Sequence, residues 1–94
     1  MRKAYIFIFN GSISKDSVKA WADAEPAVLH WRTDMPNTFY LISEKEASDL
    51  SESFLAFNGR AGRFLISEAS TNRQGILPSA TWYLLRNKQR KPEA

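Results

Sequence analysis

The sequence has no cysteine and only one histidine, His30. Without cysteine the chain has no disulfide, no thiolate metal site and no thiol nucleophile. A single histidine also excludes, within one chain, any site that needs several imidazoles. No apolar run approaches the roughly 20 residues of a transmembrane helix, so we expect no membrane partner.

The first residues do not have the pattern of a signal peptide. Met1–Lys3 is basic and Ala4–Phe9 is apolar, but the apolar stretch is short and no small-residue cleavage site follows it. We therefore expect a cytoplasmic protein. The 94 residues suffice for one domain with one core, which we place at residues 1–88, followed by a flexible basic tail at 89–94.

Positive charge is concentrated in the second part of the chain. Residues 1–58 hold six Lys or Arg and eight Asp or Glu, a net −2, whereas residues 59–94 hold seven and two, a net +5. Such a segment can attract phosphate backbones, or it can be an ordinary solvated surface. The candidate nucleic-acid-binding residues are Arg60, Arg63, Arg86, Lys88, Arg90 and Lys91.

Four segments rich in apolar residues predict strands, at residues 4–9, 27–32, 38–42 and 63–67. A first helix is expected after the strand-ending Asn10-Gly11, with Ser14 as its N-cap. A second helix is expected after the capping-box pattern Ser43-Glu44-Lys45-Glu46, with the apolar stripe Ala47, Leu50, Phe54 and Phe57. A short last helix at about residues 78–87 is expected to carry Trp82 and Leu85 inward.

This order of elements, β-α-β-β-α-β, predicts an α+β fold. With right-handed crossovers it gives a four-stranded antiparallel sheet with two helices on one face and with the first and third strands in the centre. That architecture is the ferredoxin-like sandwich, here with a short extra C-terminal helix.

The first strand is apolar on both sides, although the two helices cover only one face of the sheet. Either Tyr5, Phe7 and Phe9 or Ala4, Ile6 and Ile8 meet the helices, and the other three need a cover. The last helix folding back, a second copy of the chain, or stacked nucleic-acid bases would each provide one. We favour the second copy, with Tyr5, Phe7 and Phe9 as the dimer face, and therefore expect a homodimer.

Several segments together resemble a known family, the SinR-like small proteins. They are Thr38–Ile42, Arg63–Glu68, and the Gly-x-Leu-Pro-x-x-x-Trp pattern of Gly75, Leu77, Pro78 and Trp82, which begins seven residues after Glu68. These proteins are relatives of the CRISPR-associated adaptation endonuclease and of virulence-associated protein D. The resemblance implies a ferredoxin-like fold that is commonly dimeric through the sheet.

The same resemblance bears on catalysis. In the nuclease relatives a carboxylate ends the first strand and is proposed to hold a metal with its dimer mate, whereas this chain has Asn10 there. An amide carbonyl is a weak, uncharged ligand for a hard divalent ion, so Asn10 is interpreted as the vestige of such a site. We expect no metal, no cofactor and no catalytic residue.

Two other features have plain structural explanations. Gly59-Arg60-Ala61-Gly62 has the pattern of a phosphate-clamping loop, but a helix C-cap followed by a strand explains both glycines. His30 lies in the middle of a strand, where only Asp34 is close enough in sequence to orient it as a base.

We therefore favour a non-catalytic module that binds nucleic acid or a protein partner. A metal-dependent nuclease related to the CRISPR adaptation and virulence-associated families is the alternative from the enzyme class. A small regulatory or toxin–antitoxin component is a third possibility, and no residue separates it from the first.

Overall fold

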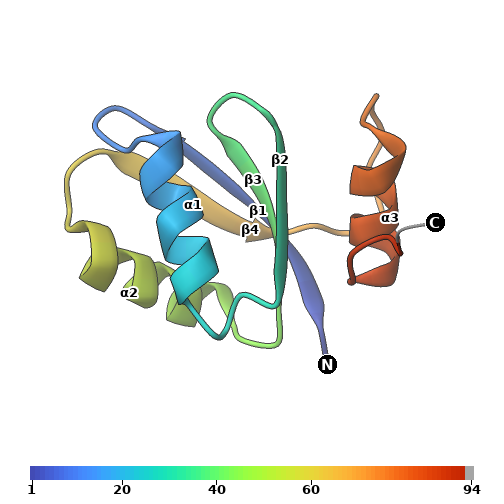
Figure 1. The fold of residues 1–94 in the computed structure, drawn as a ribbon, viewed down its shortest axis with the longest axis horizontal. Coiled ribbons are helices and arrows are strands. Elements are labelled where there is room, and N and C mark those ends of the chain that lie inside the picture. Colours follow the sequence, from blue (N-terminus) through green and yellow to red (C-terminus); the bar gives the residue numbers. More distant parts are fainter. Residues whose placement is uncertain (93–94) are drawn as a thin grey trace.

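The computed structural model describes residues 1–92, which form a four-stranded antiparallel sheet and three helices (Figure 1). The elements are β1 (Lys3–Asn10), α1 (Lys15–Ala24), β2 (His30–Met35), β3 (Thr38–Ser43), α2 (Ala47–Asn58), β4 (Arg63–Glu68) and α3 (Ser79–Asn87). The predicted α+β class and the β-α-β-β-α-β order are confirmed. The strands lie in the order β2-β3-β1-β4, so β1 and β3 are central. None of the helices in residues 1–92 is long and apolar enough to cross a membrane.

The helices α1 and α2 each bury one face against the sheet. The predicted N-cap of α1 is confirmed, since the Ser14 hydroxyl accepts a hydrogen bond from the Ser17 backbone N–H at 3.1 Å. Leu50 and Phe54 of α2 are fully buried as predicted. Phe57, expected on the same stripe, is 50% exposed.

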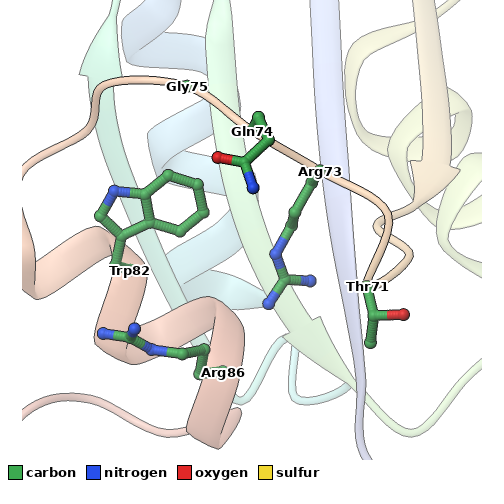
Figure 2. Close-up of a pocket in the computed structure, with 6 residues that line it drawn as sticks. All are labelled: Thr71, Arg73, Gln74, Gly75, Trp82 and Arg86. Carbon is green, nitrogen blue, oxygen red and sulfur yellow. The ribbon is translucent and has the colours of Figure 1, made fainter.

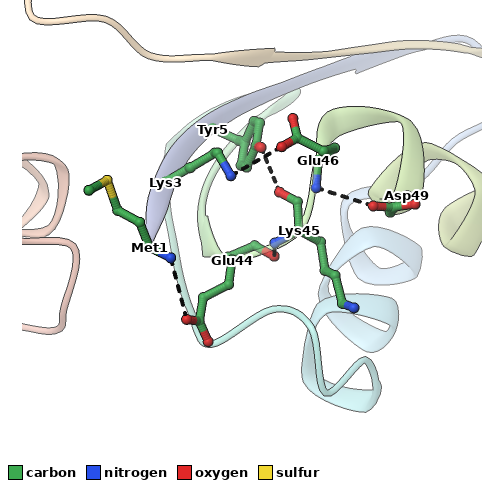
Figure 3. A network of polar contacts seen from close by, with 8 residues as sticks. Met1, Lys3, Tyr5, Glu44, Lys45, Glu46 and Asp49 are labelled. Carbon is green, nitrogen blue, oxygen red and sulfur yellow. Dashed lines mark hydrogen bonds and ion pairs between the residues drawn. The ribbon is translucent and has the colours of Figure 1, made fainter.

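The start of α2 differs from the prediction because β3 continues through Ser43. Ser43 is buried at the strand end, where its hydroxyl accepts a hydrogen bond from the Lys45 N–H at 3.0 Å instead of capping the helix. The N-cap is Glu46, whose backbone N–H donates to the Asp49 carboxylate at 3.3 Å (Figure 3). The Tyr5 hydroxyl donates to the Lys45 carbonyl at 2.6 Å, which ties this turn to β1 (Figure 3).

The second strand and its turn also differ from the prediction. The segment expected at residues 27–32 begins instead at His30, because the chain before it is held in a turn. There the Glu25 carboxylate accepts from the Ala27 N–H at 2.9 Å, and the Glu25 carbonyl accepts from the Val28 N–H at 3.0 Å. At its other end β2 continues to Met35, so the hairpin turn consists of Pro36 and Asn37, and Asn37 has a left-handed φ of 62°.

The dimer face predicted from β1 is wrong, because Tyr5, Phe7 and Phe9 are the side chains that meet α1 and α2. Their exposed fractions are 1%, 0% and 2%. The ring of Phe7 lies 5.0 Å from that of Phe54 and 5.8 Å from that of Trp21, measured between centroids. These residues form the main core and are not accessible to a second copy.

The opposite face of β1 is covered in part by the chain's own last helix. Figure 1 shows α3 on the side of the sheet away from α1 and α2. Leu84 and Leu85 of α3 form a second buried cluster with Ala4, and Ile6 packs against it. Among the three covers considered for this strand, the last helix is therefore the one found over this part of the sheet. The cover ends before Ile8, which is 49% exposed.

Candidate functional site

A buried polar network holds α3 against the β2–β3 hairpin. Thr81 of α3 is fully buried, and its hydroxyl donates to the Asp34 carboxylate and accepts from the Arg32 Nε–H at 2.9 Å. The Tyr40 hydroxyl donates to the same carboxylate at 3.1 Å. Burial, followed by the negative charge of Asp34, raises the pKa of Tyr40 to about 12. The phenol therefore stays protonated at neutral pH and keeps its hydrogen bond to Asp34, the residue that also bonds to Thr81 of α3.

Two further contacts hold the ends of the C-terminal segment to the sheet. The Ala69 N–H donates to the Ala4 carbonyl at 2.8 Å, and the Arg2 guanidinium donates to the Lys88 carbonyl at 3.0 Å. The segment between and beyond these contacts is strongly basic, because residues 69–92 hold five Lys or Arg and no Asp or Glu. The segment therefore adds positive charge, and no carboxylate of its own, to this face of the sheet.

One cleft on this surface lies between the loop after β4 and α3. It has a volume of about 500 Å³ and is lined by Thr71, Arg73, Gln74, Gly75, Trp82 and Arg86. Figure 2 shows Arg73 and Gln74 reaching from the loop toward α3, from which Trp82 and Arg86 project. The Arg73 guanidinium also donates to the Ser70 carbonyl at 2.9 Å, which supports the loop conformation. The cleft thus combines two guanidinium groups, an amide and a half-buried indole.

A second recess involves α3 and the edge strand β2. It has a volume of about 380 Å³ and is lined by Arg32, Ala80, Arg90, Lys91 and Pro92. Nearby, burial and then the charges of Arg2 and Arg90 lower the pKa of His30, so the imidazole is neutral at neutral pH. The basic tail expected at 89–94 contributes Arg90, Lys91 and Pro92 to this recess. Residues 93–94 of that tail lie outside the described range.

The structure divides the six predicted nucleic-acid-binding residues into two groups. Four of them lie in α3 or directly after it, namely Arg86, Lys88, Arg90 and Lys91. The other two, Arg60 and Arg63, lie in the α2–β4 connection and at the start of β4. Figure 1 shows that connection on the α1–α2 side of the sheet, away from α3. A single protomer therefore does not gather all six into one patch.

Three residues of the α3 surface were not among the candidates. Arg32 is distant in sequence from α3, whereas Arg73 lies in the polar loop shortly before it, and the fold brings both to the clefts beside α3. Trp82 was expected to point inward, yet it packs on the second core cluster and also lines the larger cleft. For Arg73 and Trp82 the sequence signal is composition, since both belong to the basic segment 69–92, which has no Asp or Glu.

The position interpreted as a vestigial metal site lies at the exposed end of β1. Asn10 pairs in register with Arg63 of β4, so a cation occupies the neighbouring position on the same face. Together with Ile8 and Leu65 they line a shallow recess of about 230 Å³. In the part of the chain that the structure describes, no group of three His, Asp or Glu side chains is placed to hold a metal ion.

The remaining two motifs have structural roles. Gly59 is the C-cap of α2 with φ 81°, and a Cβ added to Gly62 would lie 2.7 Å from the Ile13 side chain. The proposed orienter of His30, Asp34, instead accepts hydrogen bonds from Thr81 and Tyr40.

Comparison with known proteins returns no matching family model, no matching curated protein and no matching solved structure. The side chains around α3 line two cationic clefts, one at the β2 edge and one between the loop after β4 and α3, and the second has an aromatic wall.

Proposed function

We propose that this chain is a ferredoxin-like, non-catalytic nucleic-acid-binding protein that uses the surface of α3. The element order and the β2-β3-β1-β4 strand order support the ferredoxin-like designation. The resemblance to the SinR-like small proteins points to the same architecture.

The observation that carries this proposal is the pair of cationic clefts that α3 helps to form. Arg73 and Arg86 line one cleft, and Arg32, Arg90 and Lys91 line the other. A polyanion that crosses α3 meets positive charge in both clefts, and residues 69–92 contain no carboxylate that would repel it. The indole in one cleft favours nucleic acid over an acidic peptide, because bases stack on aromatic rings.

The surroundings of Asn10 support binding over phosphodiester cleavage. Divalent metal sites in proteins usually include at least one carboxylate, whereas Asn10 is neutral and its cross-strand neighbour is Arg63. The nuclease alternative would therefore require a site elsewhere on the molecule. Incubating labelled RNA and DNA with the protein and Mg²⁺, with and without EDTA, distinguishes the two, since we expect the oligonucleotides to remain intact in both cases.

Salt-dependent binding tests the location of the surface. In fluorescence anisotropy with a labelled oligonucleotide, we expect affinity to fall as salt rises, with a slope of about −0.7 to −0.9 per phosphate contact. The double variant Arg90→Ser/Lys91→Ser should bind more weakly and reduce the slope by about 1 to 2. The matched control, Arg60→Ser/Arg63→Ser, removes the same charge away from α3 and should retain the wild-type slope. Equal losses in both variants would contradict a surface at α3.

We also propose that the chain forms a homodimer, through the outer edge of β4 and not through the predicted face of Tyr5, Phe7 and Phe9. Within residues 1–92, β4 pairs only with β1, so its outer edge is free. Leu65 is 61% exposed and lies beside Ile8 in the ladder. Two β4 strands could pair antiparallel with Leu65 of one copy opposite Leu65 of the other. The apolar strip of Ile8 and Leu65 would then continue into the second copy, and Phe64 of each copy would lie opposite Ile66 of the other.

Light scattering tests this pairing. We expect a species heavier than the 10.7 kDa monomer at micromolar concentrations, and a monomer for Leu65→Lys. Phe57→Lys is the matched control, because Phe57 is similarly exposed on a different surface. A wild-type mass of 10.7 kDa at every concentration would rule out the homodimer.

A further inference from the structure

The cleft between the loop after β4 and α3 differs from the β2-edge recess in having an aromatic wall. The indole of Trp82 packs on the second core cluster while it also lines this cleft. A ring held in this way loses little freedom when a ligand stacks on it, because packing has already restricted its rotamers.

The other two tryptophans use their ring N–H groups inside the protein. The Trp21 indole donates to the Ser53 hydroxyl at 2.9 Å, and the Trp31 indole donates to the Asp23 carboxylate at 2.8 Å. Among the hydrogen bonds formed within residues 1–92, none is donated by the Trp82 ring. Trp82 is therefore the tryptophan whose ring has both an open side and a free donor.

The groups around this indole match the parts of a nucleotide. Figure 2 shows the Gln74 amide directed toward the Trp82 ring, with Arg73 beside it on the same loop. An amide both donates and accepts, as the edge of a base requires, and guanidinium groups bind phosphate oxygens in a bidentate manner. The volume of about 500 Å³ lies within the usual range of small-molecule sites.

We propose that this cleft binds one unpaired base of a single-stranded nucleic acid, stacked on Trp82, with Arg73 and Arg86 on the flanking phosphates. The inference rests on the proposed function and names its substrate class. In a duplex both faces of each base are already stacked, so a duplex reaches the cationic groups but leaves the indole uncovered. The protein therefore prefers single strands.

The first test uses the wild-type full-length chain. Its affinity is measured by fluorescence anisotropy for a labelled single-stranded 12-mer and for the same strand annealed to its complement. At one salt concentration we expect the single strand to bind roughly 5- to 150-fold more tightly, the factor that corresponds to stacking one base on an aromatic ring. Equal affinity for both forms would overturn the inference and leave the proposed function intact. Binding to neither form would overturn both.

The second test removes the aromatic face. Trp82→Leu keeps an apolar group against the core cluster and should weaken single-strand binding by the same roughly 5- to 150-fold, with less than about a twofold change for the duplex. Trp82→Phe keeps an aromatic face and should restore most of the affinity. Equal loss on both forms, or full single-strand affinity in Trp82→Leu, would overturn the inference.

Fluorescence provides a second readout, because the wild-type protein itself reports whether a base stacks on an indole. A stacked base quenches the emission of the indole beneath it, so the single strand should quench the wild-type emission and the duplex should not. Trp82→Phe retains Trp21 and Trp31 and should lose this quenching while still binding. Quenching that persists in Trp82→Phe would assign the stacking to another tryptophan and overturn the proposal.

Discussion

The face of the sheet that meets α1 and α2 is packed with aromatic rings, whereas the face that meets α3 combines a smaller apolar cluster with hydrogen bonds. On the first face the ring of Phe54 lies 5.0 Å from Phe7 and 5.3 Å from Trp21. On the second face Thr81 is bonded to Asp34 and Arg32. The first arrangement supplies most of the hydrophobic stabilisation. The second places α3 at a defined position while its outer side chains remain available for binding.

The largest expected effect tests the aromatic face. Phe54→Ala removes a fully buried ring and leaves a cavity, so we expect the free energy of unfolding to fall by about 3–5 kcal/mol. Phe57→Ala on the same helix is the control, and because that ring is half-exposed the loss should stay below about 1 kcal/mol. Urea denaturation followed by circular dichroism measures both. Similar losses in the two variants would mean that the burial of α2 is misassigned.

The next effect tests the polar network on the α3 face. Asp34→Ala leaves the buried Thr81 hydroxyl and the Tyr40 hydroxyl without their acceptor, and we expect a loss of about 1–3 kcal/mol. In a double-mutant cycle with Thr81→Val the two losses should be non-additive by at least about 0.5 kcal/mol. Asp23→Ala, which removes an exposed carboxylate bonded to Trp31, should cost about 0.5 kcal/mol. Additive losses would show that Asp34 and Thr81 act independently.

Local sequence patterns predicted the helices of the first face, but not the strand side chains that meet them. Ser14 marked the start of α1, and the apolar stripe of α2 placed Leu50 and Phe54 in the core, because both signals depend on residues close in sequence. The start of α2 was misplaced for the same reason. Ser43 has the chemistry of an N-cap, and only its burial at the end of β3 shows that it serves the strand.

The second face was much less predictable. Which set of β1 side chains met the helices was left open, and choosing Tyr5, Phe7 and Phe9 as the outer set was wrong, since periodicity does not distinguish two apolar faces. The larger cleft depends on the path of a loop that brings Arg73 to Trp82. A polar loop carries no periodic signal, so this approach is visible only in three dimensions.

Alkaline pH tests the polar network of the α3 face through Tyr40. Burial and Asp34 raise its pKa to about 12 in the folded chain from about 10 in the unfolded chain, so the protonated phenol stabilises the fold below pH 10. That contribution is lost as pH rises from 10 to 12, by at most about 1.4 kcal/mol per pH unit. Urea denaturation at pH 9, 10 and 11 measures the loss. Tyr40→Phe should reduce the dependence to the part that comes from groups such as Tyr5, whose pKa burial also raises, and an unchanged slope in that variant would assign the whole loss to those groups.

The smallest expected effect concerns Leu65, which lies on the α3 face of the sheet but beyond the part that α3 covers. Leu65→Thr alters a side chain that is 61% exposed, so in dilute protein the free energy of unfolding should change by less than about 0.5 kcal/mol. At higher protein concentration the wild type should gain stability, because pairing of β4 edges favours the folded state, whereas Leu65→Thr should gain none. Thermal unfolding at 2 µM and 200 µM, as order-of-magnitude choices, measures the difference. If the thermal unfolding midpoint of the wild type does not depend on protein concentration, the β4 edges do not pair. The basic residues around α3 would then bind nucleic acid from a single protomer.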